Sequence, residues 1–68
     1  MIHIIPIGAK ATANNKFKGM VISVSIRKTH IVYELQKTTE EGSYTAFFAD
    51  WEITSSHKKK SIVYQLME

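Results

Sequence analysis

Three histidines are the side chains of this 68-residue chain with the most recognisable chemistry. His3, His30 and His57 are widely and evenly spaced, and the chain has no cysteine. A zinc site takes three or four ligands, usually with at least one close pair in the sequence. We therefore predict no metal site and no cofactor, and the lack of cysteine excludes disulfides and thiolate ligands.

The hydroxyl and acidic side chains do not form a catalytic pattern either. A serine or threonine nucleophile needs a base that is held by a third group, and no serine or threonine stands in a recognisable nucleophile elbow. Asp50 and Glu52 could act as acid and base, but in a single helical turn they suit capping and solvation better. So short a chain also has little material for the walls of a pocket. We expect a protein that is not an enzyme.

The charges are arranged in blocks along the chain, which carries a net charge of +3. Residues 1–30 contain five cations and no acid, residues 31–56 contain five acids and one lysine, and Lys58, Lys59 and Lys60 follow. No segment has the roughly 20 apolar residues that a membrane span requires. Pro6 interrupts the apolar amino terminus, and no basic region precedes that run, so we expect a cytoplasmic protein.

Strict alternation of apolar and polar residues over 20–26 and 31–35 predicts two half-buried strands. In an antiparallel hairpin, paired residue numbers have a constant sum. One register with a four-residue loop over 27–30, built on a type I turn, brings the large side chains together. The predicted pairs are Ile26 with Ile31, Val24 with Tyr33, and Ile22 with Leu35.

The other segments predict further short strands and turns. Residues 2–13 form an irregular first strand that Pro6 and Gly8 interrupt, and Asn14-Asn15 forms a turn. A fourth strand covers 43–49, a helical turn capped by Asp50 covers 49–53, 54–60 is a loop, and 61–67 is a closing strand.

The facing of the fourth strand depends on the turn at Gly42. A bulge at this glycine places Phe47 and Ala49 inside, and we favour that register because Gly42 fits a left-handed position. Without a bulge, the residues that face inward are Tyr44, Ala46 and Phe48. The sequence does not decide which of Phe47 and Phe48 faces outward.

The layout of these segments resembles the Src-homology-three-like small barrel. The resemblance implies an all-β domain over 1–68, a five-stranded antiparallel barrel with one helical turn before its last strand. Segment 17–22 also resembles a KOW-type segment, and the whole chain is similar in size to small barrels encoded by phages and plasmids. The residues that carry the resemblance are Ile7-Gly8-Ala9-Lys10, Phe17-Lys18-Gly19-Met20-Val21-Ile22 and Ala49-Asp50-Trp51-Glu52-Ile53. The acidic first loop and paired aromatic ridge of the peptide-binding members have no counterpart here, so recognition of proline-rich ligands is not implied.

Two functions fit a small β-domain of this composition. The first is protein binding, through exposed aromatic side chains or through an edge strand. The first or last strand of the chain could pair with the sheet of a partner or with a second copy of the chain. Trp51 is the best anchor, although it could equally plug the core. The other aromatic candidates are Phe47, Phe48 and Tyr44.

The alternative function is nucleic-acid binding, which needs cations for phosphates and an exposed aromatic ring for stacking. The cations of three loops could converge at one end of a barrel. The candidate residues are Lys16, Phe17, Lys18, Arg27, Lys28, Lys58, Lys59 and Lys60.

Overall fold

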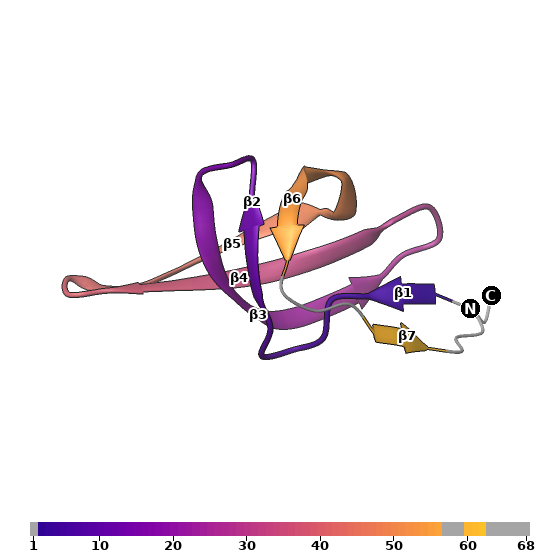
Figure 1. The fold of residues 1–68 in the computed structure, drawn as a ribbon, viewed down its shortest axis with the longest axis horizontal. Coiled ribbons are helices and arrows are strands. Elements are labelled where there is room, and N and C mark those ends of the chain that lie inside the picture. The colour runs from indigo at the N-terminus through magenta and orange to yellow at the C-terminus, as the bar shows by residue number, and fades with distance from the viewer. Residues whose placement is uncertain (1, 57–59, 63–68) are drawn as a thin grey trace.

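The computed structural model describes residues 2–56 and 60–62, and within them the chain is built almost entirely of strands. This confirms the all-β class. The only helical element of the described residues is a single 3-10 turn, so none of their helices is long and apolar enough to cross a membrane. The elements are β1 (Ile2–Ile4), β2 (Lys10–Ala13), β3 (Phe17–Ile26), β4 (Ile31–Thr39), β5 (Gly42–Ala49), η1 (Asp50–Glu52), β6 (Ile53–Ser56) and β7 (Lys60–Ile62) (Figure 1).

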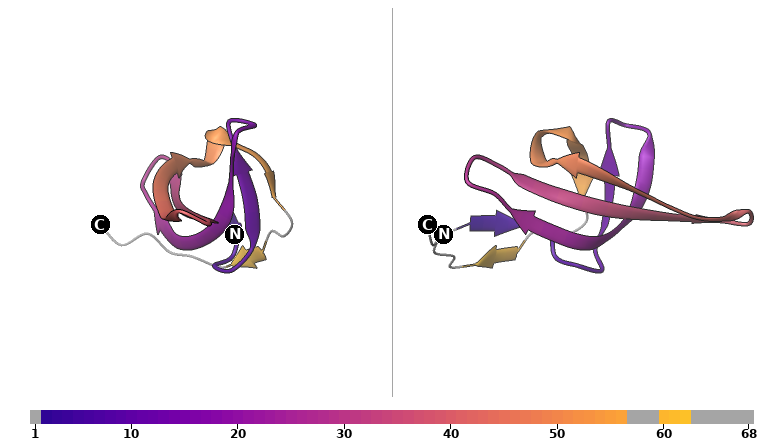
Figure 2. Two further views of the ribbon diagram at one scale, coloured as in Figure 1. Left: turned by 90° about the vertical axis from the view of Figure 1, so that its left-hand side faces the viewer. Right: turned by 180° about the vertical axis from the view of Figure 1, so that it is seen from behind.

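Five of these strands form one antiparallel sheet in the order β5-β4-β3-β2-β6, and β1 pairs with β7 in a separate two-stranded sheet. The larger sheet is strongly curved (Figure 2). The helical turn leads into β6, where we predicted a loop. The sequence of 54–56 is entirely polar and its two middle positions in β6, Thr54 and Ser55, are exposed, so the strand has no apolar alternation. The rest of the predicted closing strand, beyond Ile62, lies outside the described residues.

The hairpin of β3 and β4 keeps the predicted register only at its closed end. Ile26 pairs with Ile31 and Val24 with Tyr33, with four residues between the strands, as predicted. The predicted pairing of Ile22 with Leu35 is wrong, because a register shift between Val21 and Ser23 pairs Val21 with Leu35 instead. Such a bulge inserts one extra residue into one strand and reverses the faces beyond it. Val21 rather than Ile22 is therefore fully buried.

The hairpin of β4 and β5 has one unbroken register, so the bulge that we predicted at Gly42 is wrong. Tyr33 pairs with Phe48, Leu35 with Ala46, and Thr39 with Gly42, and no shift occurs between them. Gly42 does have a positive φ of 143°, but its turn contains only Glu40 and Glu41. Phe48 therefore packs against the core, and Phe47 faces outward with 66% of its surface exposed.

The turns follow from residues that accept unusual backbone angles. Asn14 and Asn15 have φ values of 53° and 58°, which confirms the predicted turn, and Gly8 bends the chain with a φ of 96°. The prediction of Asp50 as the helical cap is wrong. The N-cap is Ala49, whose N–H donates a 2.9 Å hydrogen bond to Oε2 of Glu52, so the last residue of the turn stabilises its start.

The core is small and lies under the middle of the sheet. It combines a few large side chains with three alanines, which let the strands approach closely. The molecule measures 42 × 22 × 18 Å, because the β4–β5 hairpin extends as an arm beyond this core (Figure 1). The buried residues are Ile5, Ala9, Ala11, Ala13, Val21, Tyr33 and Leu35.

Candidate functional site

The most prominent surface feature is the edge strand β5. It stands at one end of the sheet order and, among the described residues, pairs only with β4. Its eight residues, GSYTAFFA, contain no charge and no proline. Proteins usually protect a long edge strand with charges, proline or a bulge, because its unpaired backbone groups can bind another strand. The opposite edge strand, β6, has only four residues. The unprotected edge of the five-stranded sheet is therefore β5.

The outward backbone groups of β5 can be assigned from its last residue. The Ala49 N–H bonds to Glu52 and so points away from β4. In an antiparallel pair, residues alternate between those bonded to the neighbouring strand and those whose backbone groups point away from it. Because every second residue shares one direction, we infer that Ser43, Thr45 and Phe47 direct their N–H and C=O groups to the free edge. These six groups form a template for one more strand.

The four aromatic protein-binding candidates do not form a single patch. Phe47 faces outward next to the edge, opposite Glu34 of β4. Tyr44 and Phe48 lie on the other face of β5, where Tyr44 is half exposed on the arm and Phe48 contacts the Phe17 ring at 5.3 Å between centroids. Trp51 has 73% of its surface exposed, so it is not a plug of the core.

Trp51 stands beside a groove of about 550 Å³ between β4, η1 and β6. Its ring packs against His30, with centroids 5.2 Å apart. At the floor of the groove, the buried Tyr33 hydroxyl accepts a 3.1 Å hydrogen bond from the Ile5 N–H. Burial raises the pKa of Tyr33, and the nearby Asp50 carboxylate adds to the rise, while the Ile5 hydrogen bond opposes it. The groove is therefore lined by an exposed indole and by a phenol that stays neutral at ordinary pH.

The predicted nucleic-acid-binding residues lie in separate places. Lys16 and Lys18 stand at the start of β3, and Arg27 and Lys28 follow its other end. Phe17 is half-buried against Phe48 rather than open for stacking. Lys58 and Lys59 lie outside the described residues, and Lys60 begins β7.

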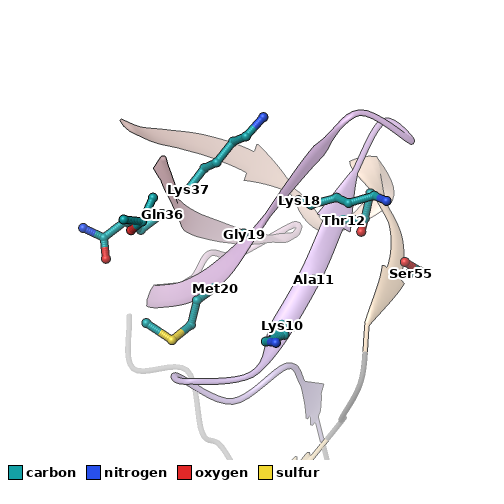
Figure 3. Close-up of a pocket in the computed structure, with 10 residues that line it drawn as sticks. Lys10, Ala11, Thr12, Lys18, Gly19, Met20, Gln36, Lys37 and Ser55 are labelled. Carbon is teal, nitrogen blue, oxygen red and sulfur yellow. The ribbon is translucent and has the colours of Figure 1, made fainter. Parts of the chain in front are cut away.

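A basic groove that the sequence analysis missed runs across β2, β3 and β4. It has a volume of about 570 Å³ and is lined by Lys10, Lys18 and Lys37 but by no carboxylate (Figure 3). Lys10 and Lys18 share the outer face because Lys10 pairs with Met20 and Thr12 with Lys18. The Lys37 ammonium lies 6.0 Å from the Phe17 ring centroid. Alternation along 10–12 and 18–20 was the signal that could have revealed this groove.

No group of three or more His, Asp or Glu side chains within the described residues could hold a metal ion. His57 lies outside that part of the chain. Comparison of the chain with protein-family models, with curated proteins and with solved structures finds no match.

Proposed function

We propose that this protein is a non-catalytic interaction module that binds an extended segment of a partner protein by strand addition to β5. The observation that carries the proposal is the long, uncharged, proline-free edge, which presents the backbone groups of Ser43, Thr45 and Phe47. Strand addition obtains affinity from main-chain hydrogen bonds and specificity from alternate side chains. Here the outward side chain of Phe47 would contact the added strand.

The side chain of Phe47 decides how tight such a complex can be. Six backbone hydrogen bonds contribute roughly 3–9 kcal/mol before the cost of ordering the peptide and of association, which is of the same size. The backbone alone therefore gives weak binding. An aromatic ring that is already held outward adds apolar contact at little entropic cost.

Several features support the resemblance to a Src-homology-three-like barrel as part of this proposal. They are a curved five-stranded antiparallel sheet, a 3-10 turn before the last strand of that sheet, and a bend at Gly8 before β2. We further propose that the protein works in the cytoplasm as a small accessory protein, of the kind that phages and plasmids encode. The lack of cysteine fits a reducing compartment.

The test is to select linear peptides from a random display library and to measure their binding to variants. Thr45→Pro removes an outward N–H that β4 does not use, whereas the matched control Thr45→Ala keeps it. We expect Thr45→Pro and Phe47→Ala each to weaken binding by about tenfold or more, and Thr45→Ala to change it little. Circular dichroism checks that each variant is folded. Selected peptides that bind folded Thr45→Pro as well as wild type would refute strand addition at β5.

Nucleic-acid binding is the second candidate, and the groove of Lys10, Lys18 and Lys37 favours it. Within the described residues Lys10 and Lys18 form no ion pair, the Lys37 ammonium lies toward the Phe17 ring, and Thr12 and Ser55 line the same groove. Cations together with hydroxyl donors suit the phosphates of a nucleic-acid backbone.

A further inference from the structure

The acidic side chains of the described residues gather around β5. All five lie on β4, in the turn that follows it, or on η1, and β5 itself contains no charge. Lys37 is the single cation between Ile31 and Glu52, and its ammonium lies toward the Phe17 ring. The five acids are Glu34, Glu40, Glu41, Asp50 and Glu52.

These acids flank both ends of the free edge. Glu40 and Glu41 form the turn that leads into β5, and Asp50 follows its last residue. The Glu52 carboxylate lies at the edge itself, because it accepts the outward N–H of Ala49. Glu34 pairs opposite Phe47, near the middle of the outer face. An added strand would therefore cover eight uncharged residues and meet negative charge at each end.

The geometry points to one kind of occupant, and this inference rests on the proposed function. We propose that β5 binds extended partner segments that have Lys or Arg at both ends of an uncharged stretch of about eight residues. Cationic side chains at the ends face the two acidic groups, while the stretch between them pairs with the backbone of β5. Acidic segments meet like charges, which disfavour pairing across a sheet.

A second copy of this chain is a poor occupant for the same reason. Antiparallel pairing of β5 with itself must bring the outward groups opposite each other, Ser43 with Phe47 and Thr45 with its own copy, and this register places Glu40 opposite Asp50 at both ends of the strand pair. Parallel pairing places every acid next to its own copy. Like charges directly opposite each other destabilise a strand pair. The acids therefore discourage self-association at an edge whose composition would otherwise promote it.

The experiment uses the full chain and the display selection described above, with the charges of the selected peptides as the first readout. We expect enrichment of Lys and Arg at both ends of the selected core and depletion of Asp and Glu. For one selected peptide, Glu41→Gln and Asp50→Asn should each weaken binding about two- to fivefold, and added salt should weaken wild-type binding. Lys16→Gln, in the turn between β2 and β3, is the control and should leave the affinity within about twofold.

The outcomes separate this inference from the function on which it rests. If Thr45→Pro abolishes binding but the peptides show no basic ends and Glu41→Gln and Asp50→Asn bind normally, strand addition stands and the charge selection is overturned. If Thr45→Pro has no effect, or if no peptide is selected, the proposed function fails and the inference fails with it. Analytical ultracentrifugation should give a monomer, and a dimer that Thr45→Pro dissociates would also overturn the inference.

Discussion

Replacing Gly19 with alanine tests how closely β3 and β4 approach each other. Gly19 lies in β3, where a Cβ atom would stand 2.7 Å from the Gln36 carbonyl oxygen and 3.2 Å from Cε1 of Phe17. Ordinary contact begins at 3.4 Å, so the backbone of β4 would have to move by a large part of an ångström. The hydrogen-bonded neighbours of β4 on both sides resist such a movement.

Two effects of opposite sign set the magnitude. Overpacking of this kind costs about 1–3 kcal/mol. Replacing glycine in a strand recovers about 0.5–1 kcal/mol, because alanine has less conformational freedom in the unfolded chain. We therefore expect Gly19→Ala to lower the free energy of unfolding by about 1–2 kcal/mol. The total for a chain of this length is only roughly 3–10 kcal/mol, so Tm should fall by about 5–15 °C.

Urea unfolding and thermal melting, both followed by circular dichroism, measure this change. Thr45→Ala is the control in the same sheet, because its side chain is exposed and the substitution should change stability by less than about 0.5 kcal/mol. Gly19→Val should be worse than Gly19→Ala, because its larger side chain meets the same carbonyl. A Gly19→Ala variant as stable as wild type would show that the two strands are not in close contact here, and the bulged register of β3 would be in doubt.

The remaining predictions concern the buried phenol and the basic groove. Tyr33→Phe should lower stability at neutral pH by about 1–3 kcal/mol, because the buried Ile5 N–H loses its acceptor. Because the pKa of Tyr33 is raised by folding, the unfolded chain releases its phenolic proton first, and wild-type stability should be lost as pH rises from about 10 through the folded-state pKa. Urea unfolding of Tyr33→Phe should lack this part of the alkaline decline. Equal declines in the two proteins would contradict the burial of the Tyr33 hydroxyl. If the basic groove binds nucleic acid, the affinity for a mixed-sequence single-stranded oligonucleotide, measured by fluorescence anisotropy, should fall steeply as salt is added. The double substitution Lys10→Gln and Lys18→Gln should make the affinity less dependent on salt. Absence of binding at low salt would rule out this function.

The sequence predicted pairings that depend on local alternation and missed those that depend on turns and bulges. Val24 and Tyr33 pair as predicted because the four-residue loop fixes the register near them. Between Ser23 and Val21 the strand contains one extra residue, so Val21 rather than Ile22 pairs with Leu35. Met20, Val21 and Ile22 are all apolar, so the sequence does not indicate which of them faces the core. The facing of Phe47 and Phe48 was ambiguous for a related reason, since the geometry of a single glycine turn decides it.

The candidate site was only half visible in the sequence. An edge strand was expected, but at the first or last segment, because chain ends often form sheet edges and the position of β5 depends on long-range pairing. The edge position of β5 depends on where β6 pairs. Residues 54–56 look like a polar loop in the sequence, yet β6 pairs with β2, so β5 remains at the other end of the strand order. From the sequence we predict that the cations of three loops converge at one end of a barrel. The structure instead places Lys16 and Lys18 at the start of β3 and Lys28 beyond its other end.

The charge pattern of the surface follows from the order of the strands. The strands β2 to β5 are neighbours in space in the same order as in the sequence, so a block of like charge along the chain becomes a block on the sheet. The acids of 31–56 therefore surround the β5 edge, while Lys10 and Lys18 line the groove over β2 and β3. A partner that approaches with a basic strand is attracted to one side of the molecule and repelled by the other. Such a division orients an incoming segment toward β5 before any hydrogen bond forms, so exchanging the charges of the two sides should slow association more than it speeds dissociation.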